Sequence, residues 1–221
     1  RENASVIVTI FVNPTQFGPS EDLSSYPRDL ERDLDMLAAA GVDLVFTPEA
    51  GEVYPPGFQT FVSVEQLSQP LEGARRPGHF RGVATVVAKL FNMAQPQRAY
   101  FGQKDAQQVR VIQQMARELD FPLEVVVCPT VREADGLAMS SRNSYLTPEQ
   151  RAAAPVLYRS LLAVQAAFQA GERDGEALRG AARAVLAAEP LAQVEYVSLA
   201  DADTLAELER VTGPALCSLA V

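Results

Sequence analysis

The feature that most constrains the fold is the alternation of apolar, strand-like runs with helical patterns over residues 1–130. Residues 6–12 form a near-continuous apolar run, typical of a strand covered on both faces of a parallel sheet. Similar runs follow at residues 42–47, 98–101 and 123–128. Strands that alternate with helices favour parallel pairing, because parallel neighbours need a crossover connection. The sequence therefore predicts an α/β fold with a Rossmann-like parallel sheet.

The predicted helices between these strands are marked by their start and stop signals. Pro27 can occupy the first helical position, and Gly41 supplies a stop. Residues 83–94 have a helical pattern, and a further helix over residues 105–119 is capped by Asp105. The stretch between residues 48 and 82 is less regular and rich in proline, so we interpret it as an excursion from the sheet.

Residues 131–221 are expected to form a smaller α+β domain after a Rossmann-like domain at residues 1–130. Thr147-Pro-Glu-Gln150 has the form of a helix-capping box. It predicts a helix over residues 148–170 that bends at Pro155, and Asp174 precedes another over residues 175–188. Strands are expected at residues 194–199 and 215–221.

Charge and cysteine usage exclude several functional classes. The 19 Lys and Arg residues against 28 Asp and Glu residues give a net charge of −9. A general nucleic-acid or anionic-membrane surface needs a basic footprint, so neither partner is expected. The apolar runs are shorter than the ~20 residues of a membrane helix. Cys128 and Cys217 lack metal-ligand spacing and are interpreted as small buried hydrophobes, which fits a reducing cytoplasm.

Several polar residues follow the predicted strands directly. Ligands of α/β sheets gather beyond the carboxyl ends of the strands, where helix N-termini present free N–H groups. The residues placed on this rim are Asn13, Gln16, Gly102, Lys104 and Asp105. Because Lys104 lies at a helix entrance, its charge opposes the helix dipole unless an anion such as phosphate compensates. A solvated surface lysine is the alternative.

The segment 131–143 is the clearest predicted phosphate-binding loop. Ser140 and Ser141 offer hydroxyl donors, and the planar guanidinium of Arg142 matches a phosphate with two N–H groups. Serines before an arginine also occur in ordinary surface turns. The second cluster at residues 101–108, with Gly102 and Lys104, makes phosphate binding the favoured interpretation.

Three further polar positions bear on the ligand. Gln16 and Gln108 each have an amide that donates and accepts, which suits a hydroxylated carboxylate substrate better than a metal. Asp33 is chiefly part of a solvated helix face, with a magnesium ion that accompanies nucleotide phosphates as the alternative role. His79, the one histidine, lies in a basic loop, where a lone histidine is more often structural than catalytic.

Multi-residue motifs in a fixed order resemble the pantoate–β-alanine ligases of the nucleotidylyltransferase superfamily. They cover nearly the whole chain. The segments concerned are 11–18 (FVNPTQFG), 26–28 (YPR), 76–83 (RPGHFRGV), 100–105 (YFGQKD), Gln107-Gln108 and 129–143.

The resemblance implies a two-step, magnesium-dependent reaction in a cytoplasmic homodimer. ATP and pantoate would give pantoyl adenylate and pyrophosphate, and β-alanine would then displace AMP to form pantothenate. Gln16, Gln108 and Asn13 would contact pantoate, with Gln16 also close to β-alanine. Lys104 and Arg142 would be catalytic. The positions implied for ATP are Gly102, Gln103, Lys104, Asp105, Val131, Met139, Ser140, Ser141 and Arg142.

One departure from the family pattern leaves other interpretations open. Family members have a strand and a His-x-x-His nucleotide loop ahead of the strand at residues 6–12, and these 221 residues contain no such motif. We therefore expect a fragment whose activity alone is doubtful. A non-catalytic protein that binds pantoate or nucleotide is one alternative. A nucleotidylyltransferase with another acceptor is a second, disfavoured by the paired Gln16 and Gln108.

Overall fold

The computed structural model describes residues 2–19 and 21–221, which divide into two compact units. The first unit contains the residues through Ser68 together with Gly73–Ala99 and Val111–Val126. The second contains Gln69–Glu72, Tyr100–Arg110 and Val127–Val221. The predicted domain boundary near residue 130 stays a prediction.

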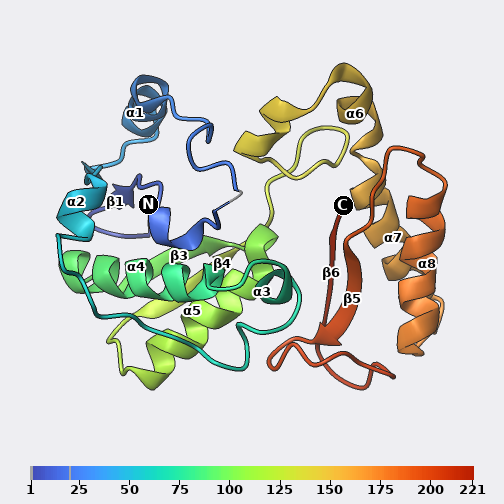
Figure 1. Cartoon of the computed structure of the whole chain (residues 1–221). Helices are drawn as coiled ribbons and strands as arrows, with labels where there is room; N and C mark the ends of the chain where they lie inside the picture. Colours follow the sequence, from blue (N-terminus) through green and yellow to red (C-terminus); the bar gives the residue numbers. More distant parts are fainter. Residues whose placement is uncertain (1, 20) are drawn as a thin grey trace. The chain divides into compact units, whose positions relative to one another are not determined.

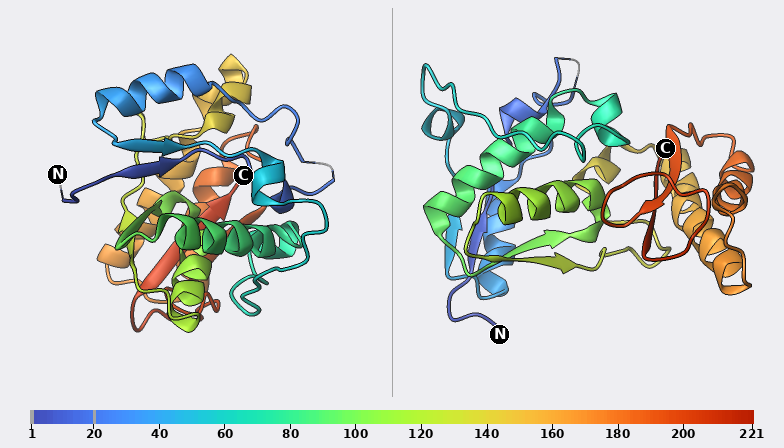
Figure 2. Two further views of the ribbon diagram at one scale, coloured as in Figure 1. Left: turned by 90° about the vertical axis from the view of Figure 1, so that its left-hand side faces the viewer. Right: turned by 90° about the horizontal axis from the view of Figure 1, so that it is seen from below.

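The first unit begins with a β-α-β element, as predicted. Strand β1 (Ile7–Thr9) pairs in parallel with β2 (Leu44–Phe46), and the two lie side by side in Figure 2. Helix α1 (Leu30–Ala39) connects them, and the Asp29 side chain caps it by accepting from the Arg32 backbone N–H at 3.1 Å. A helical connection is what parallel neighbours require.

The expectation that the strand at residues 6–12 is covered on both faces is wrong for the described residues. Ile7 is 44% exposed and Leu44 is 51% exposed. Helix α1 contributes no buried side chain, and its Met36 is 60% exposed. Apolar character in the sequence therefore does not correspond to burial at this strand pair.

The core of the first unit is centred on helix α4 (His79–Ala94). Its residues from His79 to Ala88 are all buried except the exposed Arg81. Further along the helix, Phe91 packs edge-on against Phe121 with ring centroids 5.4 Å apart. Ile112 and Met115, from the part of helix α5 (Ala106–Glu118) within this unit, are also fully buried. The short helices α2 (Ala50–Val53) and α3 (Glu72–Arg75) lie in the proline-rich excursion.

Strands β3 (Arg98–Gly102) and β4 (Glu124–Cys128) form a second pair and flank α5 in the sequence. Three 3-10 turns contain residues of interest. Turn η1 (Pro14–Gln16) comes after β1, η2 (Gln103–Asp105) comes directly after β3, and η3 (Ser141–Tyr145) comes after the loop at residues 131–140. Each of them contains residues singled out from the sequence. The α/β class and its Rossmann-like strand–helix alternation are thus confirmed.

The second unit ends in a helical pair packed with an antiparallel strand pair. Helices α7 (Val156–Gln169) and α8 (Gly175–Ala187) lie side by side, next to β5 (Tyr196–Asp201) and β6 (Ala215–Ala220) (Figure 1). Their shared core consists of Val164, Leu178, Ala182, Leu199 and Val211. Helix α6 (Pro148–Ala153) also belongs to this unit.

The local signals predicted these helices well. Thr147 and Gln150 form the capping box of α6, and the chain breaks between α6 and α7 at Pro155. Asp174 caps α8 by accepting from Ala177 N–H at 2.8 Å. In residues 2–19 and 21–221, no helix combines the length and apolarity needed to cross a membrane.

Candidate functional site

In the first unit, the predicted amide residues Asn13 and Gln16 lie at the two ends of the 3-10 turn that follows β1. Asn13 is 2% exposed and caps the turn. Its Nδ2 donates to Oε1 of Gln16 at 3.0 Å and to the Gly82 carbonyl at 3.1 Å. The hydrogen bond from Asn13 thus orients the side-chain amide of Gln16 through its Oε1. The Nε2 protons of that amide are left to donate elsewhere.

The other end of the Asn13 side chain is equally engaged. Its Oδ1 accepts from the Tyr54 hydroxyl at 2.8 Å and from the Thr15 hydroxyl at 2.9 Å. Burial raises the pKa of Tyr54, so the phenol keeps the proton that it donates. With both ends bonded to protein, Asn13 acts as a fixed support for Gln16.

His79 fixes the same turn from helix α4. Its Nδ1 donates to the Gln16 backbone carbonyl at 2.9 Å, and its Nε2 lies 3.4 Å from Nη1 of Arg76. A carbonyl only accepts and a guanidinium only donates, so the geometry fits the neutral Nδ1–H tautomer. His79 is buried, and its structural role stays a prediction.

Arg76 is held in turn by Glu21. The Arg76 Nε–Glu21 Oε1 distance is 3.0 Å, and a second N–H···O contact makes the pair bidentate. The hydrogen bond from Arg76 lowers the pKa of Glu21 below its usual range. The result is a connected series of contacts from Glu21 through Arg76 and His79 to Gln16.

In the second unit, residues 102–105 leave β3 and enter helix α5 through the 3-10 turn η2. Lys104 and Asp105 are exposed, and Nζ of Lys104 lies 3.1 Å from Oδ1 of Asp105. Gly102 and Gln103 are exposed as well. This stretch therefore presents one cation beside a helix start, the arrangement predicted for phosphate.

Gln107 and Gln108, adjacent in the first turn of α5, differ in environment. Gln107 is 5% exposed and uses both ends of its amide: Nε2 donates to the Pro70 carbonyl at 2.7 Å, and Oε1 accepts from the Glu72 N–H at 3.1 Å. Gln108 is half-buried. Gln107 thus supports the fold, whereas the contact of Gln108 with a ligand stays a prediction.

The predicted phosphate-binding loop is a tight hairpin-like turn. A bridge joins Arg132 to Ala138, and Met139 N–H donates to the Val131 carbonyl at 3.0 Å. Gly136 has φ of 93°, a conformation that other residues rarely adopt. The turn brings Val131 and Met139, both exposed, together at its open end.

Ser140, Ser141 and Arg142 follow this turn at the start of η3. The Ser140 hydroxyl oxygen caps η3 by accepting from Arg142 N–H at 3.3 Å, and its own proton stays available to donate. Ser141 and Arg142 are exposed. Hydroxyls and a guanidinium at one turn suit a polyphosphate, although their contact with ATP stays a prediction.

The described residues contain no group of three or more His, Cys, Asp and Glu side chains placed to hold a metal ion. Asp33 lies in the first turn of α1 and is half-buried. Mg²⁺ at nucleotide sites usually needs only one or two carboxylates besides the phosphates. This part of the chain is thus compatible with magnesium that arrives with ATP, and the role of Asp33 stays a prediction.

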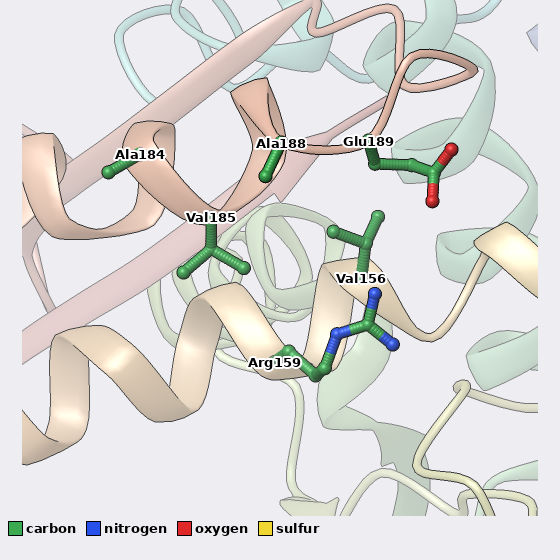
Figure 3. A pocket seen from close by; sticks show the side chains of 6 residues that line it. All are labelled: Val156, Arg159, Ala184, Val185, Ala188 and Glu189. Carbon is green, nitrogen blue, oxygen red and sulfur yellow. The ribbon is translucent and has the colours of Figure 1, made fainter.

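A cavity of about 410 Å³ lies between α7 and α8 (Figure 3). Its lining is mostly aliphatic, with one guanidinium and one carboxylate. The lining residues are Val156, Arg159, Ala184, Val185, Ala188 and Glu189. None of them belongs to the predicted site, so this cavity is separate from the chemistry.

Sequence reasoning missed Tyr54, Arg76 and Arg151 as supports of the site residues. Tyr54 lies 41 residues from Asn13, and no local pattern connects them. The motif at residues 76–83 placed Arg76 close to His79, and this spacing was the one usable signal. Arg151 contacts Glu133 and Asp135, and no local pattern connects these residues.

Comparison with known proteins identifies the family. The pantoate–β-alanine ligase family model matches residues 1–221. The chain belongs to this family. It is 67% identical over 220 residues to the pantothenate synthetase of Roseiflexus castenholzii, with all of this chain and 79% of that protein covered. It is 64% identical to the pantothenate synthetase of Herpetosiphon aurantiacus, with all of this chain and 80% of that protein covered.

Solved structures of pantothenate synthetases share the fold. A crystal structure of the Thermus thermophilus enzyme superposes with a TM-score of 0.95 at 54% identity, and the match covers 99% of this chain and 79% of that one. The Francisella tularensis pantoate–β-alanine ligase, complexed with β,γ-ATP and β-alanine, matches with a TM-score of 0.74 at 36% identity. That match covers 89% of this chain and 72% of the other.

Proposed function

We propose that the chain joins pantoate to β-alanine at the expense of ATP, with pantothenate, AMP and pyrophosphate as products. The observation that carries this proposal is the family match over residues 1–221, with relatives at 57–67% identity named pantothenate synthetase. The alternative of a non-catalytic binding protein has no such support.

In the first step, a carboxylate oxygen of pantoate attacks the α-phosphorus of ATP. The new O–P bond forms as the bond to the β-phosphate oxygen breaks, and pyrophosphate leaves with the electron pair. Negative charge therefore grows on the phosphates, and fixed cations stabilise it most. We assign this role to Lys104 and Arg142, with hydroxyl donors from Ser140 and Ser141, which are positioned by η2 and η3.

Further positions complete the proposed ATP contacts. The exposure of Gly102, Gln103, Asp105, Val131 and Met139 supports them, because exposed groups are accessible to a nucleotide. Mg²⁺ accompanies the phosphates in this proposal and supplies charge neutralisation. Asp33 stays chiefly a residue of the solvated face of α1, with contact to this ion as its alternative role.

The second step needs recognition of pantoate and β-alanine. We assign pantoate to Gln16 and Gln108, and β-alanine to Gln16. Asn13 fixes Gln16 through a 3.0 Å hydrogen bond, which supports a preorganised amide. The neutral amine nitrogen of β-alanine attacks the acyl carbon and forms the C–N bond. AMP leaves as the bond between the acyl carbon and its phosphate oxygen breaks, and the nitrogen releases one proton to solvent.

We also propose that the protein works in the cytoplasm as a homodimer. The two cysteines are free thiols, which supports a reducing compartment. The dimer is inherited from the family resemblance. Sedimentation of the purified chain tests it directly.

A coupled pyrophosphate assay tests the reaction. Pyrophosphate should appear only when ATP and pantoate are both present, and pantothenate only when β-alanine is added.

Gln16→Ala should weaken pantoate binding by roughly 1–3 kcal/mol, because a bound polar group loses its partner. Gln107→Ala is less suitable as a control, since its amide supports the fold, and Gln169→Ala at an exposed position of α7 serves instead. Pyrophosphate release that is independent of pantoate would exclude this acid as the substrate.

A further inference from the structure

Arg151 of helix α6 joins two carboxylates of the loop that precedes Ser140. Its Nη1 donates to Oδ2 of Asp135 and its Nη2 donates to Oε2 of Glu133, both at 2.6 Å. We call these three side chains the Arg151 bridge. A guanidinium presents its N–H groups in a rigid fork, so one arginine fixes the two carboxylates relative to each other.

The Arg151 bridge is connected to the turn that contains Arg142. The Asn143 side chain Nδ2 donates to Oε1 of Glu133 at 3.3 Å and to the Ala138 carbonyl at 3.1 Å. Glu133 thus uses one oxygen for Arg151 and the other for Asn143. The residue directly after Arg142 is thereby bound to the same carboxylate that Arg151 holds.

The structure around the Arg151 bridge restrains both Arg151 and the loop that it contacts. The Thr147–Gln150 capping box fixes the start of α6, with hydrogen bonds of 3.0 and 3.3 Å. Across the loop, the Arg132 guanidinium lies 4.3 Å from the centre of the Tyr158 ring. A Cβ at Gly136 would come within 2.1 Å of the same ring, so the loop is packed closely against α7. The loop is therefore supported from both helices.

The Arg151 bridge also offsets negative charge in the loop that contains Glu133 and Asp135. Glu133 and Asp135 lie within seven and five residues of Ser140, in a loop assigned to an anionic ligand. Hydrogen bonding from Arg151 lowers the pKa of Asp135, so this carboxylate is ionised at neutral pH. Two uncompensated carboxylates near the phosphates would oppose binding, and Arg151 offsets one of these charges while pairing with both.

We propose that Arg151 is a positioning residue for ATP: through Glu133, Asp135 and Asn143 it fixes the Ser140–Arg142 turn and offsets the loop's negative charge. It touches no substrate in this scheme. The inference rests on the proposed assignment of Ser140, Ser141 and Arg142 to ATP.

The test compares Arg151→Met with the parent protein. Breaking both ion pairs should raise the KM for ATP in pyrophosphate release by roughly 10- to 100-fold, the scale for small misplacement of binding groups. The KM for pantoate should change less than about two-fold, because pantoate is assigned to other residues. Arg183→Met, which removes an exposed ion pair with Glu176 on α8, is the matched control and should leave both constants unchanged. An unchanged KM for ATP in Arg151→Met would overturn the proposal.

Two further variants separate positioning from a general loss of stability. Arg151→Lys keeps the charge but lacks the two-pronged fork, so its KM for ATP should lie between those of the parent and Arg151→Met. It also serves if Arg151→Met fails to fold. Adding Glu133→Gln and Asp135→Asn to Arg151→Met should recover part of the ATP affinity, because the stranded charges are gone. A triple variant with no recovery would refute the electrostatic part, and an Arg151→Lys variant equal to the parent would refute the need for the fork.

Arg142→Met distinguishes the failure of this inference from that of the proposed ATP site. A raised KM for ATP in Arg142→Met with an unchanged one in Arg151→Met would reject the bridge alone. An unchanged KM in Arg142→Met would reject the assignment of the loop to ATP, and the bridge with it.

Discussion

At the scale of single residues, the site depends on amides and cations that differ in how far the protein fixes them. Both ends of the Asn13 amide are bonded to protein groups, so we expect it to act through Gln16. Lys104 instead has an exposed side chain that pairs with the exposed carboxylate of Asp105. An exposed cation of this kind can change partner when an anion binds, at low energetic cost.

Lys104→Met should lower the rate of pantoyl-adenylate formation by at least ~10²-fold, the scale for losing one preorganised charge at a developing anion. Folding should be unaffected, because the side chain is 40% exposed. Rapid-quench measurement of a single turnover checks the rate. The charge-matched control is Lys89→Met, whose ammonium lies 4.8 Å from the Phe58 ring centre in the first unit. A wild-type rate in Lys104→Met would remove this residue from the mechanism.

Cys217 should be an unreactive thiol. Burial, and next the negative charge of Glu207, raise its pKa to about 11, so only about one molecule in a thousand has a thiolate there at pH 8. In a Cys128→Ser background, iodoacetamide should label the native protein at least ~10²-fold more slowly than the urea-unfolded protein. Equal labelling rates would show that the β5–β6 pair opens readily.

At the scale of elements, the 3-10 turn after β1 and helix α4 are built around each other. The Gly82 carbonyl accepts from Asn13, and the Gly82 Cα faces the backbone of Thr15. His79, one turn earlier, donates to the Gln16 carbonyl. These contacts join segments more than 60 residues apart, so the position of the predicted pantoate amide depends on α4.

Gly82→Ala should damage this arrangement. The added Cβ would lie 2.5 Å from the Thr15 carbonyl oxygen and 2.7 Å from the Gln16 nitrogen, so backbone must move. We expect a loss of about 1–3 kcal/mol in the free energy of unfolding, the scale for overpacking, together with weaker pantoate binding. Urea unfolding and calorimetric titration measure the two effects.

Gly180→Ala is the matched control for this substitution. Gly180 also lies within a helix, but its Cβ would meet nothing within 4 Å. Alanine should therefore raise stability by up to about 1 kcal/mol through helix propensity. If Gly82→Ala were equally harmless, the close packing of α4 on the turn would be refuted.

At the scale of the whole molecule, the sequence predicted what is encoded locally. Caps at Thr147 and Asp174 and the break at Pro155 marked the helices, because capping and proline act within a few residues. The exposure of Ile7 was not predictable, since a strand's apolar pattern does not state which elements cover it. The roles of Tyr54 and Arg151 also depend on folding, because their partners are set by tertiary packing.

Family motifs indicated the chemistry, but their geometry required the fold. Gly102, Lys104 and residues 140–142 were identified from neighbouring charges and hydroxyls, and the structure places them at 3-10 turns. The contacts that fix those turns, such as Asn143 to Glu133, involve residues with no distinctive local signal. Sequence therefore identified the candidate ligand-binding groups, whereas their supports had to be observed.

Acid should destabilise the protein, because several of its carboxyl groups have a lowered pKa. The acids concerned are Glu21, Asp135, Glu149, Glu172, Glu176 and Asp201. A carboxylate whose folded pKa is depressed stabilises the fold fully above its unfolded pKa, here 4.5 for glutamate and 3.8 for aspartate. That contribution is lost as the pH falls through the lower folded value.

The free energy of unfolding should therefore change little between about pH 7 and pH 6 and fall steadily below about pH 4.5. Urea titrations at a series of pH values measure it. Glu21→Gln should reduce the acid dependence, because Arg76 then no longer pairs with an ionisable group. The exposed position of most of these acids makes each contribution small, and added salt should weaken them further. Stability that rises on acidification through this range would contradict the ion pairs from which the prediction is drawn.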